Sequence, residues 1–120
     1  MIRLAVCVSG GGTSLQNLLD LIAAGRLDAE VVQVVASRPN IGATARAEKA
    51  GIPVAVAAPS KATPAAEYTA AVFDPILTSR ADLVLFAGFL ALVDIPADYE
   101  WRVINIHPGL IPSFCGKGYY

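Results

Sequence analysis

The segment LAVCVSGGGTS, residues 4–14, joins a short apolar run to three consecutive glycines. An unbroken run such as Leu4 to Val8 predicts a strand that is covered on both faces, as in a parallel sheet. The glycines predict a tight turn, and Thr13 or Ser14 is suited to cap a following helix. The segment therefore predicts a strand, a turn and a helix, which together open an α/β fold.

The same alternation continues along the chain, where short β-branched runs are separated by longer alanine-rich segments. This pattern predicts repeated βαβ units and a doubly wound, mainly parallel sheet in a single domain. The predicted strands are residues 4–8, 30–36, 53–57, 83–86 and 103–107. The predicted helices run from Thr13 or Ser14 to about Ala24, from Ala43 to Ala50, and from a Thr63 cap with Pro64 at the first helical position to about Ser79.

Composition narrows the class of ligand. The chain is 55% hydrophobic, but its longest apolar run, Leu83 to Val93, is much shorter than the ~20 residues that a membrane span needs. A net charge of −1 gives no basic surface for nucleic acid.

Cys7 and Cys115 lack metal-ligand spacing and are expected to be free thiols in a reducing cytoplasm. We expect a cytoplasmic protein with small-molecule ligands, no metal, no nucleic-acid partner and no membrane contact.

The end of the sequence is apolar and aromatic, from Leu110 through Phe114 to Tyr119 and Tyr120. Chain termini are usually polar, so we expect the domain to be incomplete at its C-terminus. An apolar face left open in this way favours self-association, for which a homodimer is one form.

The turn Ser9 to Ser14 is a candidate anion site, because backbone N–H groups and the dipole of the following helix meet there. A turn without a ligand is the alternative. The dinucleotide pattern GxGxxG lacks its third glycine at Leu15, and no lysine completes GxxxxGK[ST]. A mononucleotide or sugar phosphate is therefore favoured, although Arg38 after the second strand leaves an NADP-binding oxidoreductase domain open.

A second candidate site lies at Asn105-Ile106-His107-Pro108, which contains the single histidine of the chain. Residues two apart on a strand share a face, so Asn105 and His107 are expected side by side at a strand's carboxyl end. Such a pair suits acyl transfer: Asn105 donates to the oxygen that becomes negative, and His107 moves a proton. A strand end whose polar groups are satisfied by nearby backbone is the alternative.

Together, SGGGTSLQNLLD, LVLFAGFLALV and INIHPGLIPSFCGKGYY resemble the glycinamide ribonucleotide formyltransferases in order, spacing and identity. The resemblance implies a Rossmann-like formyltransferase fold and a folate-dependent reaction of purine biosynthesis. It implies that Gly12, Thr13 and Ser14 hold the phosphate of glycinamide ribonucleotide. It also implies that Leu90, Ala91, Leu92, Val93 and Asn105 bind 10-formyltetrahydrofolate, with Asn105 and His107 catalytic.

Members of this family are longer, and the carboxylate that partners their catalytic histidine lies beyond the position of Tyr120. The 120-residue chain alone is therefore expected to have little or no activity. Many members also carry an arginine where Ala91 stands. A non-catalytic module that binds a phosphate ligand is the alternative from another class of protein.

Overall fold

The computed structural model of the chain describes residues 1–60, 62–89, 91 and 93–106. Its centre is a parallel five-stranded sheet with the strand order β3-β2-β1-β4-β5. The strands are β1 (Ile2–Val8), β2 (Ala29–Ala36), β3 (Val54–Val56), β4 (Leu83–Ala87) and β5 (Val103–Ile106). The helices are α1 (Thr13–Ala23), α2 (Gly42–Lys49), α3 (Ala65–Ser79) and the short 3-10 helix η1 (Ala97–Tyr99).

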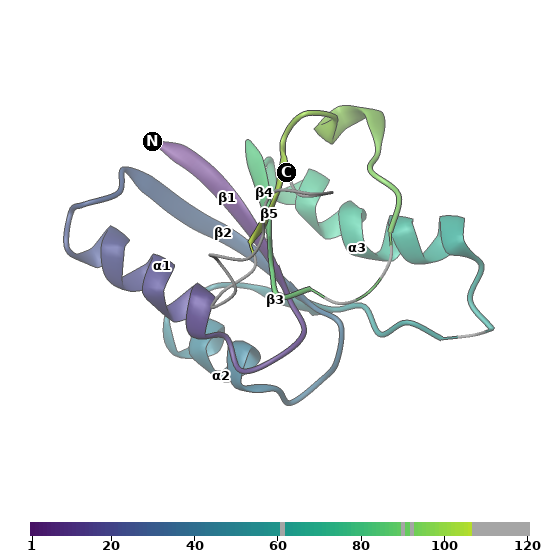
Figure 1. The fold of residues 1–120 in the computed structure, drawn as a ribbon, viewed down its shortest axis with the longest axis horizontal. Coiled ribbons are helices and arrows are strands. Elements are labelled where there is room, and N and C mark those ends of the chain that lie inside the picture. The colour runs from purple at the N-terminus through teal and green to yellow at the C-terminus, as the bar shows by residue number, and fades with distance from the viewer. Residues whose placement is uncertain (61, 90, 92, 107–120) are drawn as a thin grey trace, which may run out of the picture.

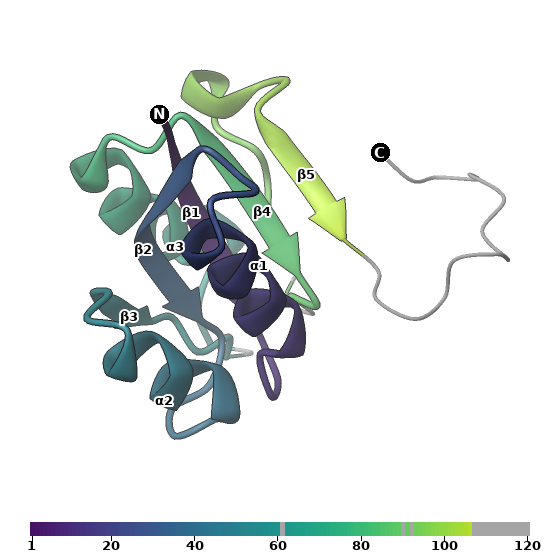
Figure 2. The same cartoon turned by 90° about the vertical axis from the view of Figure 1, so that its left-hand side faces the viewer.

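Helices cover both faces of the sheet, as Figures 1 and 2 show: α1 and α2 lie on one face and α3 lies on the other. The α3 face buries Val72, Phe73 and Ile76 against the sheet. The opposite face buries Leu15 of α1 together with small residues of α2, Ala43 and Ala47. The predicted doubly wound α/β sheet is therefore confirmed, and the unbroken apolar strands have the two buried faces that their sequence requires.

Two predicted helix starts are wrong. The N-cap of α1 is Gly12 in the left-handed region, without a side-chain cap, so Thr13 is already the first helical residue and neither Thr13 nor Ser14 caps the helix. The N-cap of α3 is Pro64, not Thr63, and it too has no side-chain cap. In both places the residue before the helix is a glycine or a proline, and its backbone conformation starts the helix without a side-chain hydrogen bond. A rule based on side-chain caps does not predict such a start.

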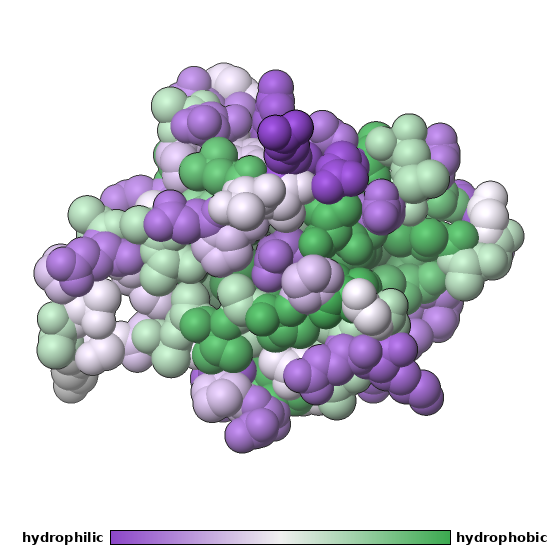
Figure 3. All heavy atoms as spheres, turned by 180° about the vertical axis from the view of Figure 1, so that it is seen from behind, coloured by the Kyte–Doolittle hydropathy of each residue, from purple (hydrophilic) through white to green (hydrophobic). Residues whose placement is uncertain are grey.

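The two edge strands of the sheet are short and partly exposed. Val56 of β3 is 50% exposed, and Ile104 of β5 is 43% exposed. Seen from behind, hydrophobic side chains form a band across the molecule between polar margins (Figure 3). Within the part of the chain that the structure describes, no helix is long and apolar enough to cross a membrane.

The order of the strands places the candidate site. The chain winds from β1 through β2 to β3 in one direction and then returns to β4 and β5 on the other side of β1. The direction of winding therefore switches between β1 and β4, which is where open α/β sheets bind ligands, at the carboxyl ends of the strands. Val8 at the end of β1 is level with Ala87 of β4, and Ala87 is level with Ile106 of β5.

Candidate functional site

The carboxyl ends of β1 and β2 are tied together by a buried polar contact. The hydroxyls of Ser9 and Ser37 lie 2.6 Å apart, and the N–H of Ser37 donates to the carbonyl of Val8 at 3.0 Å. Both serines are almost fully buried, with 2% and 4% of their surface exposed. The start of the glycine turn is therefore fixed to the neighbouring strand.

The turn itself fits closely against the start of α2. Gly12 has φ of +83°, and a Cβ at this position would lie 2.6 Å from the Cα of Ala43. A Cβ on Gly42 would lie 2.7 Å from the carbonyl oxygen of Gly11. Glycine is therefore needed on both sides of this contact, and the sequence analysis identified the Gly12 side alone.

The predicted phosphate-binding residues Gly12, Thr13 and Ser14 form the entry into α1, where Thr13 is exposed and Ser14 is half-buried. The first N–H groups of a helix have no partner inside the helix, and α1 has no side-chain cap and no acidic residue in its first turn. These donors and the positive end of the helix dipole are suited to an anion. The geometry of the turn is therefore compatible with a bound phosphate group.

Across the switch point, Asn105 lies in register with Phe86 of β4 and is half-buried. Paired residues of parallel strands share a face, and the rings of Phe86 and Phe89 pack together with centroids 5.2 Å apart on the α3 side. Gly88, with φ of +72°, turns the chain directly after β4. Asn105 therefore lies beside Phe86 near the end of β5, where a half-buried amide donor interacts with charge more strongly than it does in bulk water.

Of the residues predicted to bind folate, Ala91 and Val93 are partly buried and pack against the hydrophobic cluster beneath α3. The N–H of Asp94 donates to the hydroxyl of Thr69 at 3.1 Å, which ties the end of this segment to α3. Leu90 and Leu92 lie outside the described residues. His107 and Cys115 also lie outside them, so the predicted pairing of His107 with Asn105 stays a prediction.

Arg38, the basis for the NADP alternative, has a contact within the protein. Its Nη2 donates to the carbonyl of Ser9 at 2.6 Å. The guanidinium therefore supports the glycine turn. Sequence reasoning missed this role, since an arginine after a strand is most often solvated.

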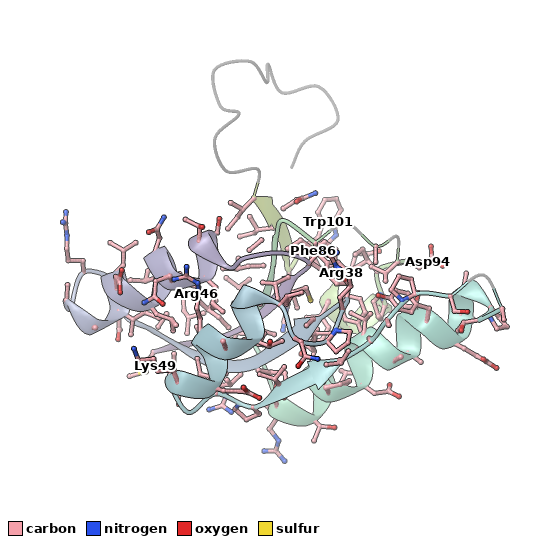
Figure 4. All side chains as sticks on the ribbon, turned by 90° about the horizontal axis from the view of Figure 1, so that it is seen from below. Arg38, Arg46, Lys49, Phe86, Asp94 and Trp101 are labelled. Atoms are coloured by element: carbon pink, nitrogen blue, oxygen red, sulfur yellow. The ribbon has the colours of Figure 1, made fainter. Side chains whose placement is uncertain are left out.

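Arg46 of α2 was also missed. Its Nε donates to the carbonyl of Gly11 at 2.9 Å, and its Nη1 donates to Oε1 of Gln16 in α1 at 3.3 Å. Figure 4 shows Arg46 on the side of α2 that faces α1. No local signal in the sequence indicates this contact, because it joins residues 35 positions apart.

Among the described residues, no group of three or more His, Cys, Asp or Glu side chains could hold a metal ion. Cys7 is a free, fully buried thiol in β1, and burial raises its pKa well above the usual value. A thiol in this state is a poor nucleophile, since the thiolate is the reactive form. Cys7 therefore has a packing role in the sheet.

A three-layer α/β fold with a glycine turn beside the switch point is shared by several classes of enzyme, and the comparisons with known proteins distinguish among them. The family model described as formyl transferase matches residues 2–120. The chain belongs to this family. This membership favours the formyltransferase interpretation over an NADP-binding domain.

The relatives point to one branch of the family. The chloroplastic phosphoribosylglycinamide formyltransferase of Vigna unguiculata is 35% identical over 120 residues, which are 98% of this chain and 38% of that protein. The crystal structure of glycinamide ribonucleotide transformylase 1 from Symbiobacterium toebii is 34% identical with a TM-score of 0.82, over 95% of this chain and 55% of that one.

A third similarity extends to a different reaction. The crystal structure of a formyltetrahydrofolate deformylase from Pseudomonas putida KT2440 is 26% identical with a TM-score of 0.78, over 96% of this chain and 41% of that chain. The chain thus spans between about a third and about half of the length of these three proteins.

Proposed function

We propose that this chain provides the substrate-binding edge of an enzyme that transfers the formyl group of 10-formyltetrahydrofolate to the amine of glycinamide ribonucleotide, in purine biosynthesis. One observation carries the proposal. The glycine turn after β1, which leads into α1 without a side-chain cap, and the amide of Asn105 on β5 both lie at the carboxyl ends of the strands. They lie on either side of the switch point. An anion donor and an oxyanion donor at one edge suit acyl transfer to a phosphorylated amine.

In this proposal Gly12, Thr13 and Ser14 hold the phosphate of the ribonucleotide, which leaves its amine free to reach the strand ends. The segment 90–93 lines the site for the pterin part of the folate. Partial burial of Ala91 and Val93 against the α3 cluster supports an apolar wall there.

The chemical step has two parts. The amine nitrogen attacks the formyl carbon, forming the new C–N bond and a tetrahedral intermediate whose oxygen is negative. Asn105 donates a hydrogen bond to that oxygen. The bond to the folate nitrogen then breaks, and His107 helps to move the proton lost by the amine to that nitrogen. Atoms and charge balance without a metal or a redox partner.

The test is a reaction of the full-length protein with both substrates, followed by mass detection of the formylated ribonucleotide. The proposal predicts a product that requires both compounds. In parallel, calorimetric titrations measure binding of each substrate alone. The proposal would be wrong if the protein does not bind glycinamide ribonucleotide, or if turnover of the folate does not require the ribonucleotide.

A second candidate is hydrolysis of the formyl folate, which the similarity to the deformylase favours. The two reactions share the donor and differ in the attacking group, which is water in hydrolysis. The same assay without ribonucleotide distinguishes them, because hydrolysis releases formate. The uncapped glycine turn supports the ribonucleotide reaction, since water needs no phosphate site.

We also propose a cytoplasmic location and assembly as a homodimer. The free Cys7 thiol is compatible with a reducing compartment. The half-exposed edges of the sheet, at Val56 and Ile104, are compatible with self-association. Fluorescence imaging of a tagged protein tests the location, and sedimentation equilibrium tests the assembly.

A further inference from the structure

Four consecutive carbonyl groups of the glycine turn accept hydrogen bonds. The carbonyl of Ser9 accepts from Nη2 of Arg38, and that of Gly10 accepts from the N–H of Ala43 at 3.2 Å. The carbonyl of Gly11 accepts from Nε of Arg46 at 2.9 Å. The carbonyl of Gly12 accepts the first bond of α1 at 2.8 Å. The first three donors all come from the segment after β2 and from α2.

This pattern fixes the direction of the N–H groups. The described part of the chain contains no cis peptide bond, and in a trans peptide the carbonyl and the next N–H lie in one plane and point in opposite directions. When the carbonyls of residues 9–11 are held toward Arg38 and α2, the N–H groups of residues 10–12 must point away from them. Successive N–H groups of a turn that point to one side bind anions, and the first N–H groups of α1 follow them directly.

Two of these donors, Arg38 and Arg46, are charged. The guanidinium of Arg46 also bridges the carbonyl of Gly11 and the side chain of Gln16, so it fixes the turn relative to α1. A charged donor on the Gly11 carbonyl also polarises that peptide and makes the N–H of Gly12 a stronger donor. Arg46 is half-buried beside the turn, where solvent screens its charge less than at the surface.

We propose that Arg46 is a positioning residue that aims and polarises the N–H groups of the glycine turn for a phosphate monoester. It acts through the Gly11 peptide. The inference rests on the proposed function, because it assigns the turn to the phosphate of glycinamide ribonucleotide. It predicts that Arg46 sets the affinity for that substrate and has little effect on the folate.

Three variants test the role of Arg46. Arg46→Gln removes the charge and the fork of donors, whereas Arg46→Lys keeps the charge on a group that cannot make both contacts rigidly. Lys49→Gln is the matched control: Lys49 lies on the last turn of the same helix, is exposed, and extends from α2 into solvent (Figure 4). Each protein is titrated with glycinamide ribonucleotide, with inorganic phosphate and with 10-formyltetrahydrofolate.

We expect Arg46→Gln to raise the Kd and the KM for the ribonucleotide by roughly 5- to 20-fold, which is less than the loss of most direct hydrogen bonds to a charged group, because Arg46 acts on the phosphate through the Gly11 peptide. Arg46→Lys should recover part of this loss. Lys49→Gln should stay within about twofold of the wild type, since an exposed charge contributes little. The Kd for the folate should change by less than about twofold in all three variants. In NMR spectra, phosphate should shift the amide signals of residues 11–14 less in Arg46→Gln than in the wild type.

The other possible results would each contradict the inference about Arg46. Equal ribonucleotide binding by the wild type, Arg46→Gln and Arg46→Lys would overturn the inference and leave the proposed function standing. Equal losses in Arg46→Gln and Lys49→Gln would attribute the effect to net charge and would also overturn it. A wild type that binds the folate but not the ribonucleotide would overturn both. If Arg46→Gln fails to fold, the same comparison is made with Arg46→Lys, from its affinity for the ribonucleotide and from the phosphate-induced shifts of its amide signals.

Discussion

Gly12 and Ala43 approach so closely that a Cβ on Gly12 would lie 2.6 Å from the Ala43 Cα and 2.8 Å from its Cβ. The contact joins the start of α1 to the start of α2. It also brings Arg46 against the turn, because the Cδ of Arg46 would lie 3.1 Å from the same added Cβ on Gly12. The shape of the candidate phosphate site therefore depends on an interface between two helices as much as on the glycine run itself.

The substitution Gly12→Ala should lower the free energy of unfolding by about 2–4 kcal/mol, the sum of a strained left-handed backbone and an overpacked contact. Chemical denaturation measures the change. The matched control is Gly10→Ala, where an added Cβ meets nothing within 4 Å. That variant should stay within about 0.5 kcal/mol of the wild type. Equal effects of the two substitutions would contradict the assigned contact.

Trp101 is 93% exposed and holds φ of +69°, a conformation that is unfavourable for a bulky side chain. Trp101→Gly should relieve that strain and raise the free energy of unfolding by up to about 1 kcal/mol, since little packing is lost. Trp101→Ala keeps the strain and should change stability less. A glycine variant that is no more stable than the alanine variant would show that the left-handed backbone at residue 101 is not strained, and a loss of stability in both variants would show that the indole contributes packing.

Residue patterns were sufficient to predict the parallel sheet and its five strands. Runs such as 4–8 and 30–36 are apolar on both faces, apart from Glu30 and Gln33 in the second run, because α1, α2 and α3 cover both sides of the sheet. The edge strand β3 is shorter than predicted, with only Val54–Val56 paired to β2. An apolar pattern indicates which residues are suited to a strand, while pairing depends on the neighbouring strand.

The candidate site was predictable where its residues are close in sequence and not where they are distant. The glycines and the helix after them signal an anion site locally. The contacts of Arg38 and Arg46 with the same turn arise from packing of α2 beside α1 and span 29 and 35 positions. A pattern read along the chain cannot show such contacts, because they exist only once the helices pack.

Cys7 connects stability to pH. Its thiol is fully buried, so burial raises its pKa above the usual 9.0, and in the folded state it stays neutral where the unfolded thiol ionises. The resulting stability is fully present below about pH 9 and is lost as pH rises further, at up to about 1.4 kcal/mol per pH unit. Burial raises the pKa of Tyr68 as well, which adds a loss of the same sign above about pH 10.

The variant Cys7→Ala isolates this contribution. Its free energy of unfolding should fall less steeply than that of the wild type above pH 9, although a cavity lowers its stability at neutral pH. Val6→Ala, on the same strand and equally buried, should be destabilised without losing the slope. Denaturant melts from pH 7 to 10.5 measure all three proteins. Identical slopes for the wild type and Cys7→Ala would show that Cys7 does not stay neutral in the fold.

Asn105 and Ile104 are neighbours on β5 that point to opposite faces, and the proposed mechanism uses Asn105 alone. Removal of one oxyanion donor typically lowers kcat about 100- to 1000-fold, so Asn105→Ala should lose turnover on this scale while Ile104→Ala loses little. Asn105→Asp is the sharper variant, because it keeps the shape but opposes the developing negative charge, and its turnover should be lower still.

Measurements of kcat for the full-length protein, with the thermal midpoint beside each, separate chemistry from folding. Asn105 is half-buried next to Phe86, so its alanine variant should lower the midpoint by only a few degrees, the shift that about 1 kcal/mol produces in a small domain. His107→Ala should lose turnover on a similar scale, because proton transfer by a positioned side chain contributes about 100- to 10,000-fold. Normal turnover in both Asn105→Ala and His107→Ala would show that other groups stabilise the oxyanion and transfer the proton. The proposed role of the carboxyl end of β5 in catalysis would then be wrong.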